Sequence, residues 1–202
     1  DTDHFKVLAD NINKSMAKLG CSIKWTHVHI SILADPSLSP TDKYLNDYHI
    51  HHASFLLKKK FPKITGFEST LNYQITGFKK ANRKTFIQPI HAGLEHWALI
   101  TNINLNESTL HNQVALYDSF LHYEKNNVKI PSAIEWQVAQ KLKNVNTRKK
   151  QEIIINVMPC HQQNNSYDCG LLTIANMTSL AQGINPSNYC YEEKTLRVLK
   201  CG

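Results

Sequence analysis

The chain has 202 residues, of which 42% are hydrophobic and 19% are charged. This composition suits one globular domain over residues 1–202 and excludes wholesale disorder. No apolar run approaches the ~20 residues that a membrane-spanning helix needs, and the N-terminal residues lack the pattern of a secretory signal. The five cysteines are scattered without C-x-x-C spacing, which argues against a disulfide framework and against a structural metal site. We therefore expect an intracellular protein of the nucleus or cytoplasm.

The net charge of +7 is gathered in short basic clusters, at 58–60, 79–80 and 148–150. Charge runs alone are weak evidence, and solvated faces explain them better than a dedicated nucleic-acid site does. Nucleic acid is therefore an alternative partner without further support. We expect a monomer with no membrane partner.

The first third of the chain mixes polar and apolar positions. We expect a helix at 10–19 and a strand at 23–33. A second helix is expected from Asp42 onward, where apolar positions follow helical spacing, and Phe61-Pro62 ends it.

Strand patterns dominate the middle of the chain. Three strands are expected, at 86–90, 97–103 and 113–118. The polar, Asn-rich stretch 104–112 suits a hairpin loop between the last two.

Helices dominate the last third of the chain. Apolar spacing predicts a helix at 132–142, and the apolar run 153–157 predicts a buried strand. A polar loop at 162–168 then leads into a helix that begins at Cys169. A last short helix is expected at 192–200.

Four residues in this layout carry the chemistry of a cysteine protease. His96 opens one strand and Asp118 closes the next, so a hairpin would hold them side by side and let the carboxylate fix the imidazole tautomer. Cys169 lies at a helix N-terminus, where unpaired N–H groups and a nearby imidazolium favour the thiolate. Gln163 lies in the preceding loop, where its side-chain N–H can join the backbone N–H of Cys169 in stabilising an oxyanion.

Other interpretations of these positions stay open. A free cysteine is usually a small buried hydrophobic residue. His91 precedes the same strand as His96, and Gln162 adjoins Gln163. Trp97 is explained equally well as a core aromatic ring and as a substrate contact.

The order His-Trp, Tyr-Asp-Ser and Gln-x5-Cys-Gly resembles the proteases that process SUMO and related ubiquitin-like proteins, distant relatives of the adenovirus-type protease. The segment 44–50 is similar to the family's Trp-Leu-Asn-Asp-x-x-Ile helix, with Tyr44 in place of the Trp. The resemblance covers about residues 40–180. The compact form of the domain is also similar to versions of this protease in mobile elements of animals.

The resemblance implies an α/β (α+β) fold of papain-like architecture, with a central mixed sheet flanked by helices and the nucleophile at a helix N-terminus. It implies cleavage after the C-terminal Gly-Gly of SUMO, ubiquitin or NEDD8, without a cofactor. Trp97 matches one of the two tryptophans that clamp the diglycine, Tyr44 replaces the other and keeps a flat ring, and Asp47 matches an acid that contacts a basic residue of the partner. Residues 40–180 would form the catalytic core, and 1–35 a substrate-recognition extension.

Two other functions are open at this point. A same-clan acetyltransferase would use a similar His-acid-Cys set, but it needs a coenzyme A pocket, of which the sequence has no sign. A catalytically silent domain would only bind a ubiquitin-like protein or, through its charge, nucleic acid. The intact set of four residues argues against a silent site.

Overall fold

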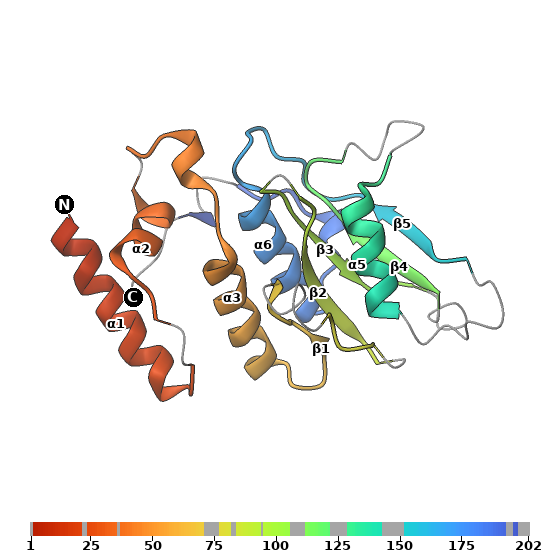
Figure 1. Ribbon diagram of the computed structural model, residues 1–202, viewed down its shortest axis with the longest axis horizontal. Coiled ribbons are helices and arrows are strands. Elements are labelled where there is room, and N and C mark those ends of the chain that lie inside the picture. Colours follow the sequence, from red (N-terminus) through yellow and green to blue (C-terminus); the bar gives the residue numbers. More distant parts are fainter. Residues whose placement is uncertain are drawn as a thin grey trace.

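A mixed five-stranded sheet forms the centre of the molecule, with helices on both faces (Figure 1). The computed structural model describes residues 2–21, 24–35, 37–70, 77–81, 84–93, 95–105, 112–121, 129–142, 152–192 and 196–197. The strands are β1 (Thr65–Gly66), β2 (Phe86–His91), β3 (Trp97–Thr101), β4 (Gln113–Tyr117) and β5 (Ile154–Met158). The α-helices are α1 (Thr2–Lys18), α2 (His27–Ala34), α3 (Asp47–Lys60), α5 (Ser132–Leu142) and α6 (Cys169–Ala181). Two short 3-10 helices are η1 (Pro40–Lys43) and η3 (Pro186–Asn188).

The strands lie in chain order across the sheet. β2, β3 and β4 pair antiparallel, whereas β1 joins β2 and β5 joins β4 in parallel. Because successive side chains point to opposite faces, each central strand contributes to two cores. This arrangement confirms the expected α/β fold with a central mixed sheet.

One core lies between the sheet and α5, and the other lies between the sheet and the pair α3 and α6. On the first face, Ile100 and Leu116 pack with Val138 of α5. On the second face, Leu99 packs with Met177 of α6. Both faces of β3 are therefore buried, which explains why its sequence is a continuous apolar run rather than an alternating one.

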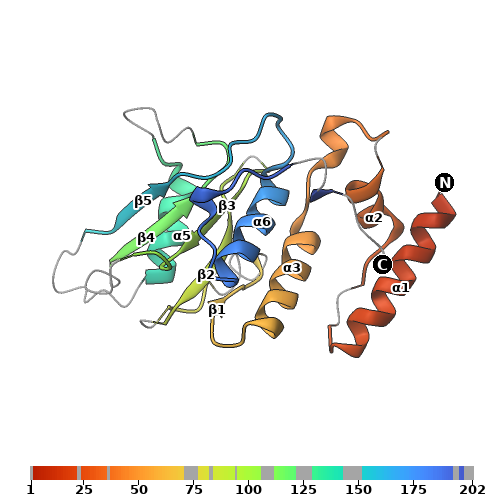
Figure 2. The same cartoon turned by 180° about the vertical axis from the view of Figure 1, so that it is seen from behind.

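The two N-terminal helices lie beyond α3, at the end of the molecule remote from β5 (Figures 1 and 2). The side chain of Asn13 bonds to both backbone groups of Trp25, at 2.8 Å from its O and 2.6 Å from its N, and so ties α1 to the start of α2. The assignment of 1–35 as a substrate-recognition extension stays a prediction.

The strand expected at 23–33 is wrong, because α2 occupies most of that range. The Thr26 N–H donates to Nδ1 of His29 at 3.0 Å, which satisfies one of the unpaired donors of the first helical turn. Ile30 then packs fully buried. Local capping and tertiary burial outweigh the β-propensity of the Val and Ile residues here.

Helix α3 begins later than expected. Asn46 is its N-cap and accepts from the Tyr48 N–H at 3.1 Å, so the helix starts at Asp47 rather than at Asp42. It ends at Lys60, directly before the predicted Phe61-Pro62 stop.

The remaining elements follow the predictions with one exception. The three central strands and the helix 132–142 are confirmed as β2, β3, β4 and α5. The first helix reaches back to Thr2. The strand expected to be buried is instead the half-exposed edge strand β5, in which Ile154 is 40% exposed, because it has a neighbour on one side only. The hairpin loop 104–112 and the last helix 192–200 lie largely outside the described residues.

Candidate active site

Cys169 is the first residue of α6 and is 1% exposed. It packs with Ile50 and Trp97, and its Sγ lies 3.7 Å from the carbonyl oxygen of Glu95. A Cβ on Gly170 would come within 2.8 Å of the Leu45 Cβ, so only glycine allows the helix to start this close to its neighbours. The fold thus places the thiol at a helix N-terminus, in a packed environment.

His96 and Asp118 form the hydrogen bond expected from the hairpin. The His96 Nε2 lies 2.8 Å from Asp118 Oδ1, because antiparallel pairing of β3 with β4 brings the start of one strand beside the end of the other. The Phe120 and Leu121 N–H groups donate to the same carboxylate oxygen at 2.8 and 3.2 Å, which fixes its position. With Nε2 engaged, the other ring nitrogen, Nδ1, is left for Cys169.

The environment of His96 favours the protonated imidazole. Burial alone would lower the pKa of His96, but hydrogen bonds and charge interactions with Asp118 and Cys169 outweigh it and raise the pKa to about 9. His96 would therefore carry a positive charge at neutral pH. That charge lies beside the thiol, where it stabilises a thiolate.

A strained turn precedes His96. Glu95 has a φ of 59°, in the left-handed region that non-glycine residues rarely occupy. The His96 N–H donates to the Gly93 carbonyl at 2.9 Å and the Ala92 N–H to the His96 carbonyl at 2.7 Å, which close the turn. The same conformation presents the Glu95 carbonyl to Cys169.

Gln163 is held by two hydrogen bonds to its side chain. Its Oε1 accepts from the Ser119 hydroxyl at 2.7 Å, and its Nε2 donates to the Asn165 carbonyl at 2.7 Å. Since a carboxamide nitrogen carries two hydrogens, one N–H is still available for a further acceptor. Ser119 follows Asp118, so the acid and the amide are fixed by the same turn.

Gln162 is anchored elsewhere. Its Nε2 donates to the backbone carbonyls of Asp118 at 3.1 Å and Cys160 at 3.2 Å. The two adjacent glutamines therefore bond to different groups.

Cys160 is unsuited to act as the nucleophile. Burial, together with the charge of Asp118, raises the pKa of its thiol to about 12. The other described cysteines are Cys21, which is buried, and Cys190, which is exposed. No group of His, Cys, Asp or Glu in the described part of the chain is arranged to hold a metal ion.

His91 does not take the place of His96. Its ring packs edge-on against Trp97, with centroids 4.8 Å apart, and burial lowers its pKa. His91 is thus a packing partner of Trp97.

The three residues expected to contact substrate differ in exposure. Trp97 is 2% exposed, and its Nε1 donates to the Leu45 carbonyl at 2.8 Å. Tyr44 is partly exposed and lies in the extended segment between η1 and α3, rather than on the helix. Asp47 begins α3 and accepts from the Thr70 hydroxyl. Their substrate roles stay predictions.

Arg197 is a site residue that sequence reasoning did not identify. Its guanidinium bonds to Asp168, with an Nε–Oδ1 distance of 2.7 Å, and stacks 5.1 Å from the ring of Tyr167. It also donates to the carbonyls of Ile32 at 3.1 Å and Lys43 at 3.2 Å. One side chain thus joins α2, η1 and the residue directly before α6.

Residues 24–199 match the Ulp1 protease family, C-terminal catalytic domain, so the chain is a cysteine protease and belongs to that family. Among curated relatives, it is 27% identical over 173 residues to sentrin-specific protease 8 of Homo sapiens, covering 74% of this chain and 76% of that protein. The Rattus norvegicus protein is 27% identical over 164 residues, 75% of each chain.

Solved structures share the fold. The C-terminal Ulp1 protease domain in complex with Smt3, the yeast ortholog of SUMO, superposes with a TM-score of 0.59 at 19% identity, covering 87% of this chain and 79% of that one. The SUMO protease Ulp1 with its catalytic cysteine oxidised to a sulfenic acid gives a TM-score of 0.61 at 18% identity, covering 94% and 89%.

Replacing Arg197 with Ala should destabilise the chain and disturb the nucleophile. Asp168 is buried, so the change leaves a carboxylate without its cation and should cost about 3–5 kcal/mol of unfolding free energy. Urea denaturation measures the loss of unfolding free energy. Under conditions where the variant stays folded, the rate at which iodoacetamide alkylates Cys169 reports whether the thiol is disturbed.

The matched control is Lys6→Ala, which breaks an exposed ion pair with Asp3 and should change stability little. Arg197→Lys should restore only part of the stability, because an ammonium cannot reproduce the forked contacts of the guanidinium. An Arg197→Ala protein as stable and as reactive as the parent would contradict this role.

Proposed function

We propose that the chain is a thiol isopeptidase that cleaves after the C-terminal Gly-Gly of a ubiquitin-like protein. The observation that carries the proposal is the 2.8 Å His96–Asp118 hydrogen bond beside Cys169 at the N-terminus of α6. Membership of the Ulp1 protease family supports it, as does the fold shared with a protease domain in complex with Smt3.

In this mechanism Cys169 attacks the carbonyl carbon of the last glycine. With a pKa of about 9, His96 is protonated at neutral pH, and its positive charge beside the sulfur favours attack by the thiolate. His96 then gives this proton to the departing lysine amine, which leaves a thioester on Cys169. The now neutral His96 takes a proton from water, which attacks the thioester; the glycine carboxylate leaves, and the thiolate returns beside protonated His96. Asp118 keeps the imidazole in one orientation throughout.

Two N–H groups would stabilise the tetrahedral oxyanion. One is the backbone N–H of Cys169, and the other is the available Nε2 hydrogen of Gln163. The Ser119 hydrogen bond to Gln163 Oε1 fixes the carboxamide, so the donor is oriented before substrate arrives.

We assign partner binding to the surface formed by the segment that precedes α3 and by the start of that helix. Tyr44 and Asp47 are partly exposed and are available to a ubiquitin-like protein. Trp97 is 2% exposed and donates to the Leu45 carbonyl, so its contact with a diglycine requires a rearrangement of the residues packed around it. Selection among SUMO, ubiquitin and NEDD8 would then depend on residues outside the catalytic set.

The decisive experiment uses ubiquitin, SUMO and NEDD8, each carrying a C-terminal electrophile. At least one probe should form a covalent adduct with the wild-type chain, visible as a mass increase on a denaturing gel. Cys169→Ala should abolish the adduct. Cys190→Ala, which removes the exposed thiol, should leave it intact.

Absence of an adduct with every probe, or an adduct that survives Cys169→Ala, would refute the proposal. Transfer of an acetyl group from acetyl-coenzyme A would instead indicate the same-clan acetyltransferase.

The pH dependence should follow His96. Because its folded-state pKa is raised to about 9, the imidazolium persists through neutral pH, and alkylation of Cys169 at constant reagent concentration should change as pH rises through 9. Asp118→Asn removes a charge that favours the imidazolium, so this transition should move about one unit or more to lower pH.

The same shift has a consequence for stability. Since the folded pKa exceeds the ordinary histidine value of 6.5, protonated His96 stabilises the folded chain fully below about pH 6.5, and this contribution is lost between pH 6.5 and 9. For the alkylation experiment, the isosteric control is Glu135→Gln on the exposed surface of α5. This change should not move the pH at which alkylation of Cys169 changes. A transition at the same pH in Asp118→Asn would show that Asp118 does not set it.

The two glutamines can be separated by kinetics. Gln163→Ala should lower kcat on a ubiquitin-like fusion substrate about 100-fold or more, with a smaller change in KM, because an oxyanion donor acts mainly in the transition state. Gln162→Ala, the matched change one position earlier, should lower kcat less. The reverse order would assign the oxyanion role to Gln162.

A further inference from the structure

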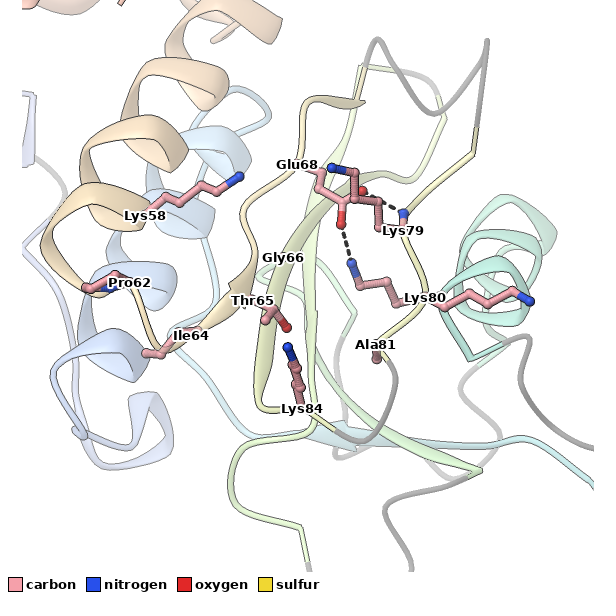
Figure 3. A pocket seen from close by; sticks show the side chains of 11 residues that line it. Lys58, Pro62, Ile64, Thr65, Gly66, Glu68, Lys79, Lys80, Ala81 and Lys84 are labelled. Atoms are coloured by element: carbon pink, nitrogen blue, oxygen red, sulfur yellow. Dashed lines mark hydrogen bonds and ion pairs between the residues drawn. The ribbon is translucent and has the colours of Figure 1, made fainter. Parts of the chain in front are cut away.

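A hollow lies between the end of α3, β1 and the residues 79–81 and 84, apart from Cys169 (Figure 3). Its volume is about 320 Å³. The charged residues that line it are Lys58, Lys79, Lys80, Lys84, Lys141 and Glu68. Five cations around one acid give this hollow a strong excess of positive charge.

The one acid is already engaged. Glu68 Oε1 accepts from Lys141 Nζ at 2.8 Å, and its Oε2 accepts from the backbone N–H of Lys79 at 2.7 Å. Among the residues that the structure describes, no ion pair joins Lys58 or Lys84 to an acid. Within the described part of the chain, their charges therefore have no acidic partner.

The floor of the hollow holds a buried cation. Lys141 is 1% exposed, and its Nζ lies 5.6 Å and 5.5 Å from the ring centroids of Phe78 and Phe86. Burial lowers its pKa, Glu68 opposes the shift, and the charges of Lys58 and Lys79 lower it further. Lys58 and Lys79 line the same hollow as Lys141, so their charges add there, and a low-dielectric floor strengthens the joint field.

The lysines come from separate elements. Lys58 belongs to the last turn of α3, where a cation complements the helix dipole, but Lys84 lies two residues before β2 and has no such role. Figure 3 shows Lys58 reaching from α3 toward the hollow and Lys84 directed at Thr65, whereas Lys80 extends away toward α5. Amines that converge from two sides suit a compact ligand better than an extended strand.

We propose that this hollow binds a small polyanion that carries two or more phosphate groups. Lys58 and Lys84 would donate charge-assisted hydrogen bonds to its oxygens from opposite sides, and Lys79 would complete the set above Glu68. Bound there, the ligand joins α3 to the strand β2. Leu45, just before α3, packs against Gly170, so the ligand would steady the helix that borders the active site.

Isothermal titration of the full chain with sodium tripolyphosphate tests the site. We expect saturable binding of one anion per chain, weakened by added salt. The double variant Lys58→Ala/Lys84→Ala should lose about tenfold or more in affinity, since each amine makes a charge-assisted bond. Lys80→Ala, the same charge change on a side chain that points away, should lose less.

The control for net charge is Lys14→Ala/Lys18→Ala, on α1, which should bind as the parent does. ATP and inositol hexakisphosphate are titrated in parallel. Their affinities show whether the site prefers a linear chain of phosphates or phosphates clustered around a ring. Absence of saturable binding, or equal weakening in the α1 control, would overturn the proposal. So would binding of a single-stranded oligonucleotide that depends on Lys58 and Lys84 when tripolyphosphate does not bind.

Discussion

The antiparallel pairing of β3 with β4 is the constraint on which the site depends. It sets Leu99 opposite Tyr117, and the residues just outside these strands, His96 and Asp118, then meet at 2.8 Å. Both strands are buried on both faces, so neither can slip by one residue without moving apolar side chains out of two cores. The fixed strand register therefore also fixes the hydrogen bond between the His96 imidazole and the Asp118 carboxylate.

Cys169, the proposed nucleophile, reaches this pair through helix packing. α6 crosses the face of the sheet that α3 also covers, and Gly170 lets its first turn approach Leu45 closely. Arg197 and Asp168 hold the loop in front of that turn. The thiol is therefore positioned by two cores and one ion pair, and the chemistry requires little local strain apart from the turn at Glu95.

Much of this arrangement could be predicted from the sequence because its signals are local. The central strands and α5 carry continuous apolar or helical patterns, and His96, Asp118, Gln163 and Cys169 lie at the boundaries of these elements. The errors have physical causes. At 23–33, capping by Thr26 and burial of Ile30 override β-propensity, and the late start of α3 depends on Asn46. Arg197 was missed because its partners are far away in sequence and two of them are backbone carbonyls, which leave no pattern.

The long sequence separation between Arg197 and its partners also bears on the order in which the site is completed during synthesis. Its contact with Ile32 spans 165 positions of sequence. During synthesis, the loop before Cys169 emerges from the ribosome before the arginine that fixes it, and domains complete their packing only once their last segments are available. The loop before Cys169 therefore gains this support only after Arg197 has been made, however early its own residues emerge.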